Sequence, residues 1–266
     1  MVAILNAREI EAMRRAGEAA AATLAHVGER LQPGVTTADV DAWVRAHTAA
    51  LGGIPSQLGY QGFPAAVCTS RNDVVCHGIP RPDETLADGD IVNVDVTTML
   101  GGFHGDTSAT FVIGEASRET RDLVAIARAC RDAGIAVVRE GARLGDVGAA
   151  IEETARAAGV SVVRDYGGHG IGRSMHMDPH VPHVGTRGAG MRLRAGMAIT
   201  IEPMINAGGP GVRVLSDGWT VATADGSRSA QFEHTVIVTK GGCEITTLGA
   251  TAPDRATTLP SCRARP

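Results

Sequence analysis

The chain has 266 residues, of which 44% are hydrophobic and 20% are charged, and its formal net charge at pH 7 is −4. These values predict a soluble globular protein with one large domain or two small ones around a sizeable core. The weak negative charge excludes a strongly basic surface for nucleic acid, and no apolar run approaches the length of a membrane span. The 5 scattered cysteines and the lack of a secretory signal pattern predict reduced thiols in a cytoplasmic protein.

Helical periodicity recurs along the chain, with loops and strands between the helical stretches. Apolar residues at helical spacing predict helices over about residues 7–31, 36–50, 118–139 and 144–158. Asn6 is the expected N-cap of the first helix, and Pro33-Gly34 is expected to stop it. Alternating apolar residues predict two strands with a turn at 100–102 between them, over residues 91–97 and 109–113. Strands and loops follow up to residue 248, and the aperiodic residues 249–266 predict a disordered tail.

The second and fourth predicted helices begin with the same motif, Gly-x-x-x-x-Asp-Val. It occupies residues 34–40 and returns 107 residues later, at 141–147. The same offset pairs Asp95 with Glu202. We interpret these matches as an internal duplication. Two helix–helix–strand halves would then pack into one α+β domain with a shared central sheet.

The duplication also predicts a cluster of acidic side chains. An offset of 127 residues pairs Asp106 with Glu233, so a pseudo-twofold axis would bring two carboxylates from each half together. A turn centred between Leu100 and Gly101 would place Asp95 directly opposite Asp106, with Cβ atoms about 4.5–5.5 Å apart. Carboxylates held so close in apolar segments need a shared proton or a cation. We therefore expect two bridged divalent ions; the alternative is that each acid is an ordinary turn or edge residue.

A histidine in a glycine-rich segment adds to this cluster. His169 lies within residues 166–172, where the glycines allow close approach of the backbone. One imidazole among four carboxylates makes an oxygen-rich site, which suits a pair of Mn²⁺, Fe²⁺, Co²⁺ or Zn²⁺ ions better than a structural zinc. The alternative is a hydrogen-bonding turn histidine, and the neighbouring acids favour the metal ligand.

These five residues resemble, in type, order and local sequence, the five metal ligands of the methionine aminopeptidases. The matching segments are Asn93-Val94-Asp95-Val96-Thr97, Gly105-Asp106-Thr107, Gly168-His169-Gly170-Ile171-Gly172, Thr200-Ile201-Glu202-Pro203-Met204 and Gln231-Phe232-Glu233-His234-Thr235. The resemblance spans about residues 6–248 and implies a pita-bread fold of two pseudo-symmetric halves around a central antiparallel sheet. It implies one catalytic domain over residues 1–248, with halves of about 7–115 and 116–248. Glu202 follows His176 by only 26 positions, which is too short for the type II insertion, so the chain is similar to the type I, bacterial enzymes.

The resemblance also implies roles for residues around the metal ligands. His77 matches a histidine near the substrate amide, and His176 matches one that contacts the scissile carbonyl. Glu202 is implied to move the proton from the attacking water to the leaving amine, in addition to binding metal. The residues implied to line the methionine side-chain pocket are Tyr60, Phe63, Cys68, Met175 and Trp219. Gln57 stands where some relatives have cysteine, and without the family each of the two histidines would be read as an ordinary loop residue.

The implied function is removal of the N-terminal methionine from nascent proteins and peptides whose second residue is small. Water activated by two divalent ions per chain (Co, Mn, Fe(II) or Zn) would attack the first peptide bond. The expected partners are nascent chains that begin with methionine, with the ribosome as a candidate site of association. We expect a monomer that binds no specific nucleic acid and no membrane. The alternatives are a prolidase or aminopeptidase P-like enzyme, whose relatives carry an additional N-terminal domain, and a non-enzymatic binding module of the same fold.

Overall fold

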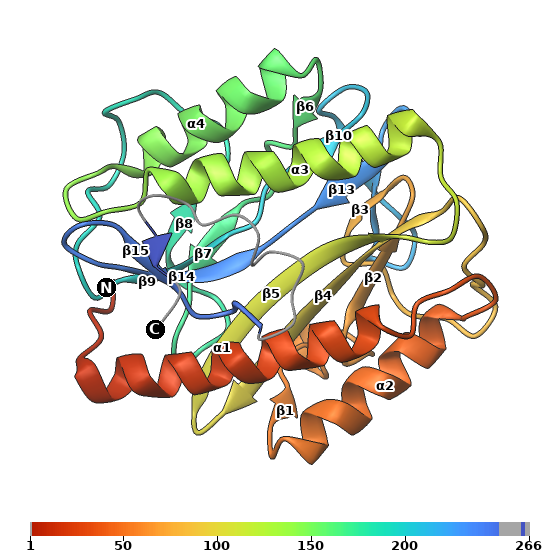
Figure 1. Ribbon diagram of the computed structural model, residues 1–266, viewed down its shortest axis with the longest axis horizontal. Coiled ribbons are helices and arrows are strands. Elements are labelled where there is room, and N and C mark those ends of the chain that lie inside the picture. The colour runs from red at the N-terminus through yellow and green to blue at the C-terminus, as the bar shows by residue number, and fades with distance from the viewer. Residues whose placement is uncertain (1, 250–261, 264–266) are drawn as a thin grey trace.

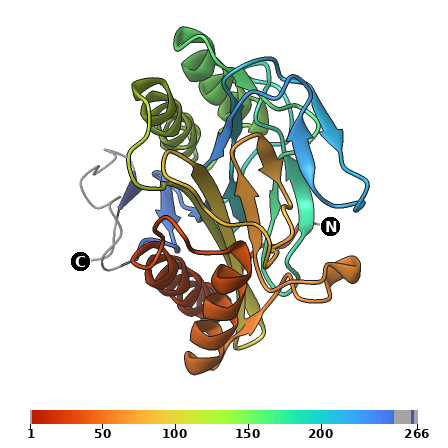
Figure 2. The ribbon, with the colours of Figure 1, turned by 90° about the vertical axis from the view of Figure 1, so that its right-hand side faces the viewer.

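The computed structural model describes residues 2–249 and 262–263, and its helices gather on one side of its strands (Figures 1 and 2). The α-helices in this part of the chain are α1 (Ala7–Gly28), α2 (Thr37–Ala50), α3 (Arg118–Ala136) and α4 (Leu144–Ala157). The elements between α2 and α3 are β1 (Ile54–Pro55), the 3-10 turn η1 (Tyr60–Gly62), β2 (Cys68–Arg71), β3 (Val74–Cys76), β4 (Ile91–Leu100) and β5 (Phe103–Val112). The strands after α4 are β6 (Ser161–Val162), β7 (Gly168–Gly170), β8 (Met177–Val181), β9 (Ala198–Ile201), β10 (Met204–Asn206), β11 (Val212–Val214), β12 (Val221–Thr223), β13 (Ser229–Gln231), β14 (His234–Val238), β15 (Cys243–Ile245) and β16 (Cys262–Arg263).

The helices begin where the sequence predicts because polar side chains cap them. Asn6 Oδ1 accepts hydrogen bonds from two backbone N–H groups of the first turn, and the Glu9 side chain accepts one from Asn6 N–H. The same reciprocal arrangement starts α2. An N-cap of this kind stabilises a helix by about 1 kcal/mol. The first and third helices end earlier than predicted, at Gly28 and Ala136.

The hydrogen-bond pattern repeats between the two halves at the predicted offset. An isolated β-bridge between Thr36 and Thr85 has its counterpart between Arg143 and Arg192, 107 residues later in both partners. The backbone hydrogen bonds beside the two bridges repeat in the same way. The predicted α+β architecture of two pseudo-symmetric helix–helix–strand halves is therefore confirmed.

The β4–β5 hairpin differs from the predicted register. Asp95 lies opposite Ser108, and Asp106 lies opposite Thr97, so the prediction that the two aspartates face each other directly is wrong. The turn is centred between Gly101 and Gly102, which have φ angles of 61° and 80°. A two-residue hairpin turn of this type needs positive φ at both central positions, which glycine adopts without strain. The two aspartates become diagonal neighbours on the same face of the hairpin.

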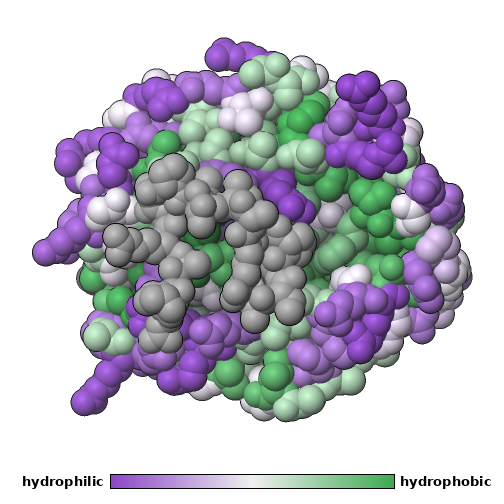
Figure 3. Space-filling view, viewed as in Figure 1, coloured by the Kyte–Doolittle hydropathy of each residue, from purple (hydrophilic) through white to green (hydrophobic). Residues whose placement is uncertain are grey.

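Each half has a large buried cluster, the halves share a smaller cluster in which α1 packs against Ile171, Ala198 and Ile237, and β5 lies beside β14 at the junction. One buried cluster packs α1 and α2 against β4, and the larger one packs α3 and α4 against β9 and β14. The junction is held by Thr235 Oγ1, which accepts from Asp106 N–H at 3.1 Å and donates to Asp106 O at 2.8 Å. Hydrophilic side chains are interspersed with pale and hydrophobic ones over the outward faces of the helices (Figure 3). Among the described residues, no helix combines the length and apolarity that crossing a membrane requires.

The cysteines are not all reduced thiols. Cys68, Cys76 and Cys130 are free and buried, but Cys243 is disulfide-bonded, so the prediction is wrong there. In the backbone register of the parallel β15–β16 pairing, Cys243 lies opposite Cys262. The rest of the predicted tail, residues 250–261 and 264–266, lies outside the described residues.

Candidate metal centre and active-site cleft

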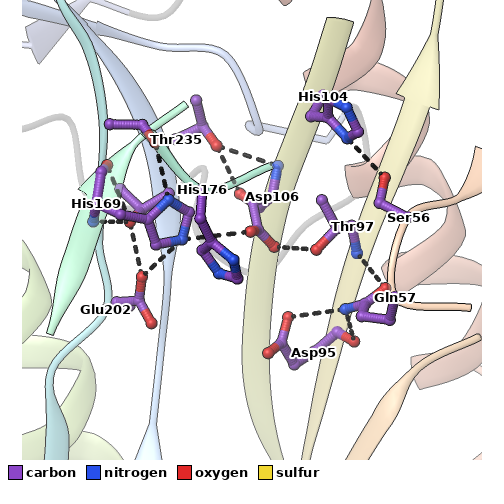
Figure 4. A network of polar contacts seen from close by, with 12 residues as sticks. Ser56, Gln57, Asp95, Thr97, His104, Asp106, His169, His176, Glu202 and Thr235 are labelled. Atoms are coloured by element: carbon purple, nitrogen blue, oxygen red, sulfur yellow. Dashed lines mark hydrogen bonds and ion pairs between the residues drawn. The ribbon is translucent and has the colours of Figure 1, made fainter. Parts of the chain in front are cut away.

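The five predicted ligands come from strands of both halves and meet in one cavity. Asp95 lies on β4, Asp106 on β5 and His169 on β7, while Glu202 follows β9 and Glu233 precedes β14. All five line the same cavity, of about 210 Å³. Ligand atoms of Asp106, His169 and Glu233 lie within 4.8 Å of one another. His169 Nε2 is 3.8 Å from Asp106 Oδ2 and 3.5 Å from Glu202 Oε1 (Figure 4).

Burial and mutual repulsion make this cluster unfavourable for bare negative charge. Burial raises the pKa of all four carboxyl groups, to about 7 for Asp106 and about 8 for Glu202. Neighbouring carboxylates raise the pKa of Asp95, Glu202 and Glu233 further. Burial, followed by the charge of His176, lowers the pKa of His169 to about 3, so its imidazole stays neutral. Neutral imidazole and closely spaced acids are a donor set that a divalent cation stabilises.

The orientation of the donors also fits a metal. His169 Nδ1 lies 3.0 Å from Gly170 O, which fixes the proton on Nδ1 and leaves the Nε2 lone pair facing the carboxylates. Within the described residues, the buried Glu233 Oε1 has no hydrogen-bond partner. A buried carboxylate oxygen left without a donor is costly, and a cation would satisfy it. The residues present therefore fit a metal centre of divalent ions.

Threonines that the sequence reasoning missed hold the acidic side chains in place. Thr97 Oγ1 donates to Asp106 Oδ1 at 2.7 Å, and Thr200 Oγ1 donates to Glu202 Oε1 at 2.6 Å. Thr200 Oγ1 also accepts from His169 N–H at 2.9 Å. A signal was present in the sequence, because Thr97, Thr200 and Thr235 each lie two residues from a candidate ligand. That spacing puts both side chains on one face of a strand.

Two further histidines, His77 and His176, line the cavity that holds the cluster. His77 has a φ of 56°, in the left-handed region, and burial followed by the charge of His176 lowers its pKa to about 4. Its ring packs edge-on against Trp219, with ring centroids 6.3 Å apart. The His176 ring meets the His169 ring edge-on at 4.2 Å, and its Nδ1 lies 2.8 Å from Tyr60 Oη. A non-glycine residue with positive φ is strained, which is typical of residues held for function.

The predicted side-chain pocket opens directly onto the cluster. All its predicted members line the cavity that holds the acids, namely Tyr60, Phe63, Cys68, Met175 and Trp219. Phe63, Cys68 and Met175 are buried, and Phe63 meets Trp219 edge-on with ring centroids 5.2 Å apart. The pocket is therefore an apolar slot with acids at one end. A second cavity, of about 390 Å³, continues from the cluster past Tyr166 and His180.

The histidines without a predicted role divide into two groups. His183 Nε2 accepts from the backbone N–H of Glu202 at 3.3 Å, so this histidine touches the site although the sequence did not single it out. His180 lines the neighbouring cavity. His104 and His234 bind the hydroxyl groups of Ser56 and Thr247, at 2.8 Å each, and neither lines the cavity of the cluster.

Comparison with known proteins agrees with this geometry. Residues 11–240 match the model of metallopeptidase family M24. The chain is 50% identical to methionine aminopeptidase A of Synechocystis over 248 residues (93% of this chain, 98% of the relative). It is 45% identical to the methionine aminopeptidase of Escherichia coli over 248 residues, covering 93% of this chain and 94% of the relative.

Solved structures give the same grouping. The methionine aminopeptidase of Rickettsia prowazekii superposes with a TM-score of 0.92 at 46% identity, and the match covers 93% of this chain and 100% of that one. A prolidase of Pyrococcus furiosus superposes with a TM-score of 0.73 at 20% identity, covering 92% of this chain and 65% of that one, which shows a shared fold alone. The chain therefore belongs to metallopeptidase family M24 and, within it, to the methionine aminopeptidases.

Proposed function

We propose that the protein removes the N-terminal methionine from peptides and nascent proteins whose second residue is small. The observation that carries this proposal is the single cavity in which a buried apolar slot ends at a cluster of four acids and a histidine. The slot matches an unbranched apolar side chain, and the cluster lies where the bond next to that residue would be. The relatives at 45% and 50% identity, all methionine aminopeptidases, support the same substrate.

The proposed cofactors are two divalent ions, of cobalt, manganese, iron(II) or zinc. Asp106 and Glu233 would bridge both ions, Asp95 would hold one, and His169 with Glu202 would hold the other. When bound, the ions lower the pKa of a water molecule for attack and polarise the scissile carbonyl. A single ion would leave part of this acid cluster uncompensated, which favours a pair.

The chain's own side chains move the protons and hold the substrate. The Glu202 carboxylate takes a proton from the attacking water and passes it to the leaving amine. His176 Nδ1 lies 2.8 Å from Tyr60 Oη. In the proposed tautomer the Tyr60 hydroxyl donates this hydrogen bond, and His176 Nε2–H is free to donate a hydrogen bond to the carbonyl oxygen as negative charge develops there. His77 also lines this cavity, where it contacts the substrate amide and limits the size of the second residue.

The setting of the enzyme is part of the same proposal. Residues 1–248 form one catalytic domain with halves of about 7–115 and 116–248, and the protein acts as a monomer. It works in the cytoplasm on nascent chains, near the ribosome, because N-terminal methionine is first available there. This location rests on the substrate and not on the cysteines, since Cys243 is disulfide-bonded.

The test is hydrolysis of Met-Ala-Ser against Gly-Pro peptides, with and without a chelator. We expect release of methionine from Met-Ala-Ser, loss of release after chelation, and its return with added divalent metal. Norleucine in place of methionine should be discriminated against poorly, with a kcat/KM lower by at most about 10- to 200-fold, because a small misfit in an apolar pocket costs only about 1–3 kcal/mol. Preferential cleavage of Gly-Pro peptides would favour a prolidase, and no cleavage of either would favour a binding module.

A further inference from the structure

Gln57 fills a gap along one edge of β4. That strand has β5 on one edge and, on the other, β1 followed by β2. The pairing with β1 ends at the hydrogen bond from Ser56 N–H to Thr97 O, at 2.9 Å. The pairing with β2 begins where Cys68 lies opposite Asp95. Within the described chain, no strand accompanies the part of this edge between the two pairings.

The carboxamide of Gln57 takes the place of the missing strand. Its Oε1 accepts from Thr97 N–H at 3.1 Å, and its Nε2 donates to Asp95 O at 3.0 Å (Figure 4). One donor and one acceptor are what a peptide group of a neighbouring strand would supply. Gln57 is only 6% exposed and Thr97 is buried, so without this carboxamide the Thr97 N–H would lie buried and unpaired.

The same nitrogen also reaches the carboxylate of Asp95. Gln57 Nε2 lies 3.5 Å from Asp95 Oδ1, at the long end of hydrogen-bond distances. One carboxamide therefore contacts both the backbone and one carboxylate oxygen of Asp95. Because glutamine is uncharged, it does this without adding a further negative charge to the four acids.

We propose that Gln57 is a positioning residue for Asp95 and raises the affinity of the cation that Asp95 holds. This inference rests on the proposed function, in which Asp95 is a ligand of one of the two ions. A carboxylate already held in one orientation loses less conformational freedom when it binds a cation. Removing such an outer partner of a metal ligand weakens metal binding about 10- to 100-fold.

The experiment titrates metal-free protein with Mn²⁺ in a calorimeter. Gln57 also lines the cavity, so a variant should keep the size of its side chain. Gln57→Met keeps the length and volume but has no N–H donor. Gln57→Asn keeps the carboxamide but is too short to span Thr97 and Asp95. Ser56→Ala is the matched control, because it removes a neighbouring hydrogen bond to His104 that does not involve the acids. Asp95→Asn identifies which Mn²⁺ equivalent depends on that carboxylate.

We expect both Gln57 variants to weaken the Asp95-dependent equivalent about tenfold and to leave the other unchanged. Ser56→Ala should bind both equivalents as the unmodified protein does. A purely structural role would lower the Tm of the metal-free variants while both affinities stay unchanged, and that result would overturn the proposal. Equal weakening of both equivalents would overturn it too, because it would indicate a general distortion.

The calorimetric readout separates this inference from the proposed function. Metal affinity is measured without turnover, so it can be compared among variants whether or not a peptide is cleaved. Unmodified protein that binds Mn²⁺ but releases no methionine from Met-Ala-Ser would refute the proposed function and leave the comparison of Gln57 variants valid. Cleavage by unmodified protein together with unchanged Mn²⁺ affinity in the Gln57 variants would refute only the inference about Gln57.

Discussion

Replacing Thr200 with valine tests how one hydroxyl group supports two metal ligands. Thr200 Oγ1 donates to Glu202 Oε1 at 2.6 Å and accepts from His169 N–H at 2.9 Å. Valine has the same shape without the oxygen, so it removes both hydrogen bonds and leaves packing nearly unchanged. Thr200 itself is fully buried, so water does not replace the lost oxygen.

The loss of one hydrogen bond should lower folding stability, and the loss of the other should lower metal affinity. The His169 N–H loses its hydrogen-bond partner in the folded protein, with or without metal. This loss should lower the free energy of unfolding of the metal-free protein by about 1–3 kcal/mol. A hydrogen bond to a charged carboxylate is worth about 1.5–3 kcal/mol, which corresponds to about a 10- to 150-fold loss of affinity for the ion that Glu202 holds. Denaturant unfolding measures the first quantity, and Mn²⁺ calorimetry measures the second.

Thr200→Ser is the matched control, because it keeps the hydroxyl and removes only a methyl group. It should bind Mn²⁺ as the unmodified protein does and lose at most about 1 kcal/mol of stability. Thr200→Val that binds both Mn²⁺ equivalents normally would refute the reasoning. So would a serine variant that is as impaired as the valine variant.

Three further substitutions probe the rest of the site and the fold. Asp106→Asn should lose metal and activity together in metal analysis and peptide assays, because a bridging anion becomes a neutral amide; a fully active, metal-replete variant would contradict the bridging role. His77→Ala should lower kcat/KM by about 10²-fold or more while metal content stays normal; unchanged kinetics would remove His77 from the mechanism. Burial raises the pKa of Asp90, but hydrogen bonds from Arg71, Asn72 and Ala87 N–H outweigh this and leave it below its usual value. Asp90→Asn should therefore cost about 1–3 kcal/mol at pH 7. The difference should shrink as the pH falls below about 4, where the carboxyl of the unfolded chain takes up a proton, and should continue to shrink through the lower pKa of the native carboxyl; urea unfolding that shows the same difference at pH 3 as at pH 7 would contradict this.

Much of the acidic cluster was predictable because its members sit in strongly patterned segments. The duplication paired Asp95 with Glu202 and Asp106 with Glu233, and the structure brings all four into one cavity. Repeats of this kind are readable because they preserve spacing along the chain, and spacing determines which residues a pseudo-twofold axis brings together.

The errors arose where a local detail decided the outcome. Moving the hairpin turn by one residue, from Leu100-Gly101 to Gly101-Gly102, changed every pair in the β4–β5 register. Both turns contain glycine, and the sequence alone did not distinguish them. The disulfide of Cys243 was missed because 5 scattered cysteines carry no signal that distinguishes oxidised from reduced thiols.

The supporting polar residues were hidden for a different reason. A threonine in a strand is usually explained by strand preference, so the two-residue spacing of Thr97 and Thr200 from candidate ligands was not enough to single them out. Gln57 acts through a side chain that substitutes for a strand, and this depends on a gap in β4 pairing that only the three-dimensional arrangement reveals. Tertiary contact, and not local sequence, assigns these side chains to the site.

The central claim is that buried acids from both halves share divalent cations in one cavity. The most direct test is an anaerobic titration of Mn²⁺ into metal-free protein, with methionine release from Met-Ala-Ser measured at each step. We predict that each chain binds two equivalents of Mn²⁺ and that activity rises as they bind. The Glu233→Gln variant should be unable to bind them. Full activity in metal-free protein, or tight binding that persists in Glu233→Gln, would contradict it.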